Sequence, residues 1–319
     1  MEILTKMNRT IVLITIFFAS LMCSAQDVED PQRGVKIYSL VTTINNGKPK
    51  HYGSLEELNK IDFTNISSVS IDNRGRKGKM DMVLLDKLIN NSPNLISLTL
   101  HNVIFDRLPK IEINNNLRQL YLGRNDLEII PDDIENLKAL ELFSCSGNKI
   151  NSLPNKFVNL KSLNTLLLGG NNFTTFPSQM FALKKLTTLG FNEKVDNIPE
   201  EIAKLSELKK ISLLATNIST LPSKFSKLKN LQVAELAQTK LTDFPSSLLK
   251  IQTLKYLSLC GNPINKVTFA QSLKGLSAKD LVIYSSLEEA ERLELNKTYP
   301  NVDFASEIMQ WDIERIVVK

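Results

Sequence analysis

The sequence repeats itself with a period of 22 or 23 residues. Residues 117–139 read LRQLYLGRNDLEIIPDDIENLKA, and residues 140–162 read LELFSCSGNKINSLPNKFVNLKS. Nine such blocks begin at residues 66, 95, 117, 140, 163, 186, 208, 231 and 254. The first contains a longer insertion, the block at 186 is one residue short, and the last is truncated. A block this short cannot bury its own apolar side, so the blocks must stack around a shared core.

Each block has two halves with different backbone preferences. In the first half, Leu117, Leu120 and Leu122 place three apolar side chains on one face of a short strand. In the second half, a proline precedes an apolar pair three residues apart, such as Ile134 and Leu137, which suits a helical or 3₁₀ turn. The prolines are Pro131, Pro154, Pro177, Pro199, Pro222 and Pro245. Strands inside and wider turns outside predict a curved solenoid.

The pattern LxxLxLxxNxLxxLPxxIxxLxx resembles the leucine-rich repeat family over residues 66–267. The resemblance implies an α/β solenoid with a curved parallel β-sheet on its concave face, short helical, 3₁₀ or extended turns on its convex face, and terminal caps. It also implies a ladder of buried amides that hydrogen-bond the backbone of adjacent turns. The ladder residues are Asn125, Asn148, Asn171 and Asn262.

The ladder is expected to be interrupted in four blocks. The asparagine place holds Val103, Lys194, Thr216 and Thr239 there. A threonine hydroxyl can keep part of the bonding, whereas valine cannot. We also expect an irregular curvature at the short block that begins at residue 186.

Residues 1–25 have the three-part plan of a secretory signal peptide. Lys6 and Arg9 precede an apolar run from Ile11 to Met22, and Ser24 and Ala25 follow. We expect cleavage after Ala25 and a periplasmic, cell-surface or secreted protein. The alternatives are an amino-terminal membrane anchor and lipid attachment at Cys23, where Met22 departs from the small residue usual at such sites. Removal of residues 1–25 lowers the net charge from +5 to +4.

The regions outside the repeats predict caps that cover the exposed ends of the core. Residues 26–65 contain an Asn46-Gly47 hairpin turn and a helix start at Ser54 and Glu57. Residues 268–319 contain a helix that Ser286 and Glu289 would open, then a closing strand at 301–304. Residues 305–319 receive no assignment.

The number and spacing of the cysteines and the distribution of charge restrict the possible functions further. Cys145 and Cys260 lie five repeats apart, about 24 Å at the spacing of stacked strands, which excludes a disulfide. The absence of cysteine-rich caps favours a bacterial exported protein.

Many lysines lie in the outer halves of the blocks, which predicts a solvated convex face. They include Lys138, Lys161, Lys184, Lys185, Lys227 and Lys229. The basic loop with Arg74, Arg76, Lys77 and Lys79 has no interleaved aromatic residue, which disfavours nucleic-acid binding.

No constellation in the sequence predicts catalysis, a metal site or a cofactor site. His51 and His101 stand outside any metal spacing, and no phosphate-binding glycine motif or nucleophile elbow is present. His101 is expected to be a lone exposed residue of the inner surface. We therefore predict a non-enzymatic protein without cofactors.

Binding on the concave face is the predicted function. The residues between the leucines form columns there, and the expected contact points are Tyr121, Arg124, Leu142, Leu167, Leu214, Val233 and Tyr256. Among these, Tyr121, Leu142 and Leu167 are predicted to form an exposed anchor cluster beside Arg124. Enclosure of Leu142 or Leu167 would contradict this prediction.

The predicted partner is a protein or peptide held by a monomeric exported recognition module, with no nucleic acid and no stable membrane insertion after signal cleavage. The alternative is a surface adhesin or structural spacer that binds weakly at many points, for example to glycans.

Overall fold

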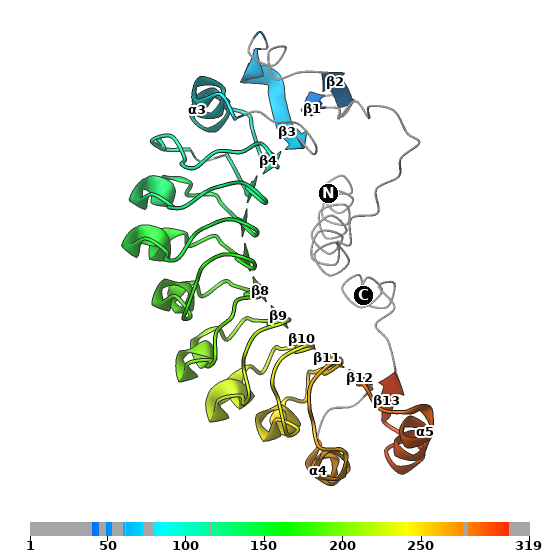
Figure 1. The fold of residues 1–319 in the computed structure, drawn as a ribbon. Coiled ribbons are helices and arrows are strands. Elements are labelled where there is room, and N and C mark those ends of the chain that lie inside the picture. The colour runs from blue at the N-terminus through cyan, green and yellow to red at the C-terminus, as the bar shows by residue number, and fades with distance from the viewer. Residues whose placement is uncertain are drawn as a thin grey trace.

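The computed structural model describes residues 40–44, 49–52, 60, 62–72, 79–114, 116–276 and 280–305. These residues form one curved solenoid, with strands along the inner face and short helices along the outer face (Figure 1). The predicted fold is confirmed. The predicted signal peptide, the Asn46-Gly47 turn, the helix start at Ser54 and most of the basic loop lie outside the described residues.

The strands form a single sheet of thirteen in the part of the chain that the structure describes. They are β1 (Leu40–Ile44), β2 (Pro49–Tyr52), β3 (Ile66–Asp72), β4 (Ser97–His101), β5 (Gln119–Tyr121), β6 (Leu142–Ser144), β7 (Thr165–Leu167), β8 (Thr188–Gly190), β9 (Lys210–Ser212), β10 (Val233–Glu235), β11 (Tyr256–Ser258), β12 (Leu281–Tyr284) and β13 (Val302–Ala305). Strands β3 to β13 pair in parallel in chain order. Strand β1 pairs antiparallel with both β3 and β2.

The helices of the described residues are short. They are η1 (Phe63–Asn65), α3 (Met82–Asn90), η2 (Asp132–Asn136), η3 (Asn155–Asn159), η4 (Ser178–Ala182), η5 (Glu200–Lys204), η6 (Ser223–Lys227), η7 (Ser246–Lys250), α4 (Lys266–Ser272), η8 (Leu273–Gly275) and α5 (Glu289–Thr298). Helix α3 occupies the insertion in the first block.

The six prolines start the 3₁₀ helices η2 to η7, as predicted. Each is the residue before the helix, with φ between −62° and −74°. Its carbonyl accepts the first hydrogen bond of the turn, as when the Ile134 N–H donates to Pro131 O at 3.1 Å. Proline suits this place because its ring holds φ near the helical value and because the first N–H of a helix has no partner inside it.

One apolar core runs through the stacked units. Leu117, Leu120, Leu122, Ile134 and Leu137 are completely buried in it, as predicted. Full burial of one such side chain is worth about 1.5–3 kcal/mol. Because every unit contributes a similar set, the core is continuous from η1 to β13.

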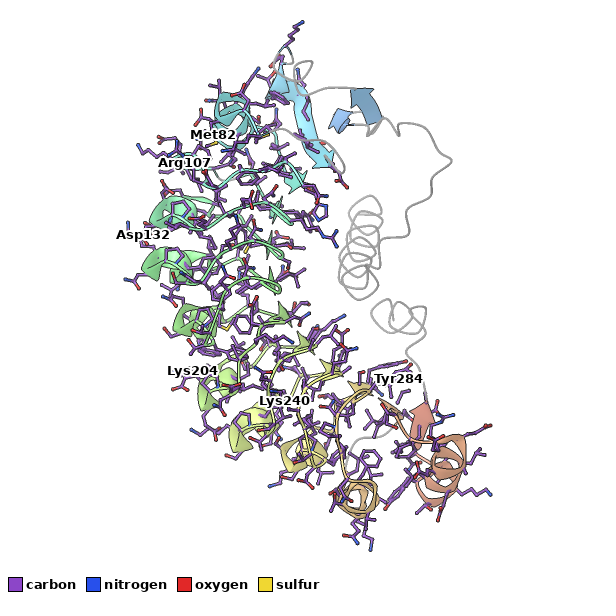
Figure 2. The ribbon with its side chains drawn as sticks, viewed as in Figure 1. Met82, Arg107, Asp132, Lys204, Lys240 and Tyr284 are labelled. Atoms are coloured by element: carbon purple, nitrogen blue, oxygen red, sulfur yellow. The ribbon has the colours of Figure 1, made fainter. Side chains whose placement is uncertain are left out.

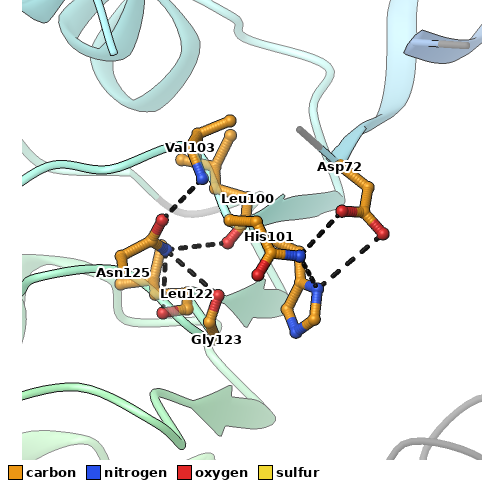
Figure 3. A network of polar contacts seen from close by, with 8 residues as sticks. Asp72, Leu100, His101, Val103, Leu122, Gly123 and Asn125 are labelled. Carbon is orange, nitrogen blue, oxygen red and sulfur yellow. Dashed lines mark hydrogen bonds and ion pairs between the residues drawn. The ribbon is translucent and has the colours of Figure 1, made fainter. Parts of the chain in front are cut away.

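The asparagine ladder is present at all four predicted residues. Asn148 shows the pattern: its Oδ1 accepts from Leu127 N at 3.0 Å, and its Nδ2 donates to Leu122 O and Cys145 O, both at 2.8 Å. Asn125, Asn171 and Asn262 make equivalent bonds. Each amide therefore joins its own turn to the unit before it, as Figure 3 shows for Asn125.

The four predicted interruptions behave differently. Thr239 donates to Leu236 O at 3.1 Å, which confirms the partial bonding expected of a threonine. That expectation is wrong for Thr216, whose buried hydroxyl has no hydrogen-bond partner among the described residues. Val103 makes no side-chain bond of this kind, but its N–H donates to Asn125 Oδ1 at 2.8 Å. The assignment of Lys194 to the ladder is also wrong, because Glu193 occupies that place.

A left-handed residue precedes the ladder residue in most units. It is Asn102, Arg124, Gly147, Gly170, Ala215, Gln238 or Gly261, with φ between 53° and 73°. Glycine adopts this conformation without strain, and other residues pay about 1–2 kcal/mol for it. The short block at 186 lacks the left-handed residue. Its ladder residue is Glu193, and the residue before it, Asn192, occupies the position that precedes the left-handed residue in the other units. The missing residue therefore lies before the ladder place, which is why counting 23 residues from Asn171 reached Lys194.

The last residues of several units form a second polar ladder, which the sequence analysis missed. Ser162 Oγ donates to Lys138 O, Asn230 Nδ2 to Ser206 O and Thr253 Oγ1 to Lys229 O, at 2.8–3.1 Å. Asn116 donates in the same way to Pro93 O of the preceding unit, and Asn94 donates to Thr64 O of η1. The sequence feature that could have predicted these hydrogen bonds is a serine, threonine or asparagine directly before the first leucine of a block.

The carboxyl-terminal end differs from the prediction in two ways. The parallel sheet continues past residue 267 through β12, which the sequence analysis did not predict, and ends at the predicted closing strand β13. Helix α5 is capped by Glu288 and Glu291 rather than by Ser286 and Glu289. Ser286 Oγ instead accepts from Gly261 N at 2.9 Å.

The outer edge of β13 is protected against pairing with another strand. The Phe304 N–H donates to Asn296 Oδ1 at 2.9 Å, and the Val302 N–H donates to Tyr299 O at 3.0 Å. Exposed strand edges otherwise recruit further strands. These two bonds therefore close the sheet at its carboxyl-terminal end.

Substitution of Asn148 by leucine should lower the free energy of unfolding by about 2–4 kcal/mol, since it leaves the Leu127 N–H buried without an acceptor and removes one of the two donors to Leu122 O and to Cys145 O. Urea unfolding followed by circular dichroism measures this. Thr216→Val is the matched control at an equivalent place where no bond is made, and it should cost less than about 1 kcal/mol. Equal losses in the two variants would contradict the ladder.

Candidate functional site: the concave sheet face

The strand register aligns the residues of the concave face in columns. The first column is Gln119, Leu142, Thr165, Thr188, Lys210, Val233 and Tyr256. The second column is Tyr121, Ser144, Leu167, Gly190, Ser212, Glu235 and Ser258. The blocks therefore stack in register, as predicted, and residues far apart in the sequence become neighbours on one surface.

Leu142 and Val233 are not exposed, which contradicts the sequence-based expectation for these two residues. Leu142 is 5% exposed and Val233 is 4% exposed, although neither belongs to the main core. The register places Gln119 and Thr165 directly beside Leu142, and Lys210 and Tyr256 directly beside Val233. Because side chains converge on the inner side of a curved sheet, an apolar side chain between two close cross-strand neighbours loses its contact with solvent. The predicted exposed anchor cluster therefore does not exist in that form.

The other five predicted contact residues keep access to solvent. Tyr121, Leu167, Leu214 and Tyr256 are half-buried, and Arg124 is exposed. Leu167 lies against β8, where a Cβ on Gly190 would stand 2.9 Å from Leu167 Cδ2. Glycine at this position gives the leucine room to lie along the sheet.

The seven residues do not form one site. Tyr121, Leu142 and Leu167 come from the neighbouring strands β5, β6 and β7. Val233 and Tyr256 lie on β10 and β11, so β8 and β9 separate the two groups. Contact points are therefore distributed along the face.

An ion pair that the sequence analysis missed lies between these two groups. Lys210 Nζ on β9 is 2.9 Å from Glu235 Oε1 on β10, and the side chains are only 15% and 18% exposed. The sequence feature that could have predicted this ion pair is a lysine and a glutamate in adjacent blocks and adjacent columns of the concave face. The two charges compensate each other, so this part of the face presents little net charge.

An aromatic pair lies at the carboxyl-terminal end of the face. The rings of Tyr256 and Tyr284 stack with centroids 6.4 Å apart and an interplanar angle of 22°. Tyr284 belongs to β12 and lies on the inner side of the solenoid (Figure 2). It was missed because the sequence analysis did not predict β12.

A polar network lies at the amino-terminal end of the face (Figure 3). Asn102 Nδ2 donates to Asp72 Oδ1 at 2.9 Å, and His101 Nδ1 lies 3.8 Å from Asp72 Oδ2. A Cβ on Gly123 would stand 2.9 Å from His101 Cδ2, so this glycine makes space for the imidazole. The expectation of a lone exposed histidine is wrong, because His101 is largely buried beside a carboxylate.

The convex face carries the solvated charges, as predicted. Asp132 and Lys204 point outward from it (Figure 2). Ion pairs link neighbouring units there, for example Lys156 Nζ and Glu135 Oε1 at 2.9 Å. The hydrogen bonds from Lys156 and Asn159 lower the pKa of Glu135 below its ordinary value. The charged side chains of this face are therefore exposed to solvent and paired between units.

The described residues contain no group of three histidine, cysteine or acidic side chains that could hold a metal ion. No helix among them is long and apolar enough to cross a membrane. Cys145 is buried in the core, and burial raises the pKa of its thiol far above the ordinary value. Cys145 and Cys260 are not joined to each other by a disulfide in the part of the chain that the structure describes.

The comparisons with known proteins agree with this geometry. A family model described as a leucine-rich repeat region matches residues 106–214. A leucine-rich repeat protein of Leptospira interrogans superposes with a TM-score of 0.52 at 22% identity, over 79% of this chain and 86% of that one. Residues 106–214 are therefore a leucine-rich repeat region, and the described chain has the leucine-rich repeat fold. No curated protein matches this leucine-rich repeat chain.

Two further solved structures share the leucine-rich repeat fold. An internalin of Listeria monocytogenes gives a TM-score of 0.54 at 19% identity, over 69% of this chain and 63% of that one. The Arabidopsis receptor kinase HAESA, in complex with the peptide hormone IDA and a co-receptor, gives 0.51 at 22% identity, over 70% of this chain and 43% of that one. At these identities the likeness shows the common fold.

A double-mutant cycle with Lys210→Met and Glu235→Gln should give a coupling energy of about 1–2 kcal/mol in urea unfolding, because the pair is mostly shielded from solvent. The matched control is Lys255→Met with Asp280→Asn, a pair 3.9 Å apart with both side chains more exposed. The control pair should show no measurable coupling. The same coupling in both cycles would mean that the concave pair is as solvated as a surface pair.

Proposed function

We propose that this protein is a non-enzymatic exported recognition module whose concave sheet holds a protein or peptide. The observation that carries the proposal is the character of the inner face, where short uncharged side chains alternate with tyrosine and leucine over successive strands. The charges in the two columns, Lys210 and Glu235, form an ion pair. Such a face suits a largely uncharged polypeptide rather than a nucleic acid, which requires unpaired cations.

The fold comparison supports the choice of a polypeptide partner. The receptor kinase that shares this fold was solved with a peptide hormone bound. By analogy of fold, the same kind of ligand is proposed here, and the analogy does not extend to its sequence or binding residues.

The proposed contact residues are Tyr121, Arg124, Leu167, Leu214 and Tyr256. Each is at least partly accessible and lies on the inner face or its rim. Leu142 and Val233 are proposed to support the contact surface, because they are buried between their cross-strand neighbours. The binding energy would then be divided between the two groups of contact points.

Export and the monomeric state are further parts of the proposal. Their support is the apolar run from Ile11 to Met22 with its basic flank and the small residues before Gln26, and, for a monomer, the protected edge of β13. We propose cleavage after Ala25.

The variant Leu167→Ser with Leu214→Ser should capture its partner at least about tenfold more weakly than the unaltered chain, since it removes two accessible apolar contacts, one on β7 and one just after β9. The assay is crosslinking and pull-down from an extract of the native cell envelope, quantified against protein concentration. The control is Lys138→Ser with Lys204→Ser on the convex face, which should leave capture unchanged.

Unchanged capture by the concave variant, or equal loss in the control, would contradict the proposed binding face. Adhesion that is multivalent, sensitive to salt and abolished only by many dispersed substitutions would instead support the adhesin or spacer alternative.

A further inference from the structure

Glu193 takes the ladder place in the unit that lacks the left-handed residue. Its side chain is only 4% exposed, and its Oε1 accepts from Asn171 N at 2.6 Å. The carboxylate also accepts a hydrogen bond from the backbone of Phe173. Glutamate is one methylene longer than asparagine, and this extra length compensates for the residue that the unit has lost.

The hydrogen-bonding needs of the ladder place favour a group that both accepts and donates. Asn148 accepts from one N–H and donates to two carbonyls at the equivalent place. An ionised carboxylate only accepts, whereas a neutral carboxylic acid accepts and donates one hydrogen bond. The neutral form of Glu193 is therefore the closer substitute for asparagine.

The surroundings of Glu193 favour the same form. Burial raises the pKa of Glu193 to about 7, while the N–H groups of Asn171 and Phe173 act in the opposite direction. No charged side chain of the described residues contributes to the shift. The titratable group near it is the Cys145 thiol, which burial and the Glu193 charge both disfavour as a thiolate.

The neighbouring residues offer no compensating charge. The ammonium group of Lys194, the next residue in the chain, donates to Ala215 O at 2.7 Å and is held at the surface. In the following unit, the ladder place holds the neutral Thr216, whose buried hydroxyl has no hydrogen-bond partner in the described part of the chain. An ionised Glu193 would therefore lie in the core without a cation.

We propose that Glu193 is a proton-controlled joint in the middle of the solenoid. Uncharged, it completes the amide ladder between the units that begin at 163 and 186. Ionised, it places a charge in the core without a cation beside it, so the joint opens more readily. Asn192 and Gly190 of the same unit belong to the concave face, so opening of the joint would disturb that face at its centre.

The direction of the pH dependence follows from the raised pKa. The folded protein holds the Glu193 proton more tightly than the unfolded chain does, so this stabilisation is complete below the ordinary value of 4.5. It is lost as the pH rises from there through about 7. The joint is therefore closed in mildly acidic solution and weakened above neutrality.

Hydrogen exchange of the full chain tests the proposal at the amides of Asn171 and Phe173. After correction for intrinsic rates, their protection factors should fall at least about tenfold between pH 5.5 and pH 8. In Glu193→Gln, which accepts and donates at every pH, they should change less than about twofold. The control Glu201→Gln alters an exposed glutamate of the same unit and should behave like the unaltered chain.

Two results would overturn the proposal. One is a fall in protection in Glu193→Gln that equals that of the unaltered chain. The other comes from infrared spectroscopy of the unaltered chain, which does not depend on the variant folding. A buried protonated carboxyl band should disappear with a midpoint near pH 7, and absence of that band at pH 5.5 would mean that Glu193 is already ionised.

Discussion

The turn that follows each strand brings backbone N–H and C=O groups into the interior, and each of them needs a hydrogen-bond partner. Helices and sheets satisfy such groups by their own regularity, but these turns do not. The buried amides of Asn125, Asn148, Asn171 and Asn262 supply the partners and, in doing so, tie each unit to the one before it. Stacking of the leucines provides the apolar free energy, and the amides fix the register in which they stack.

The concave face is a consequence of that register. Once the strands align, residues 22 or 23 positions apart become direct neighbours, and curvature brings their side chains together. Gly123 and Gly190 leave space for His101 and Leu167, while Leu142 and Val233 are buried between their cross-strand neighbours. Charges on the face are neutralised locally, as by Lys210 and Glu235. A partner would therefore meet a broad and nearly neutral surface with dispersed apolar points.

The period, the strands, the proline-started turns and the asparagine ladder were predictable because each depends on residues within one unit. Predictions failed where the outcome depends on neighbouring units or on a local change of length. The alternation of leucines predicts that Leu142 points to the concave face. It does not predict how closely the side chains of the neighbouring strands pack against Leu142. Counting residues placed Lys194 in the ladder because the sequence does not reveal where a unit has lost a residue. Strand β12, LVIY, was missed because it follows α4 instead of a complete repeat.

The central claim is that buried amides hold the units in register. Hydrogen exchange resolved by nuclear magnetic resonance tests it at the N–H groups of Leu127, Ile150 and Leu241, which donate only to ladder side chains in this structure. The account predicts protection comparable to that of the central strand amides, because these groups open only when a unit separates from its neighbour. Exchange as fast as that of exposed convex amides would contradict it.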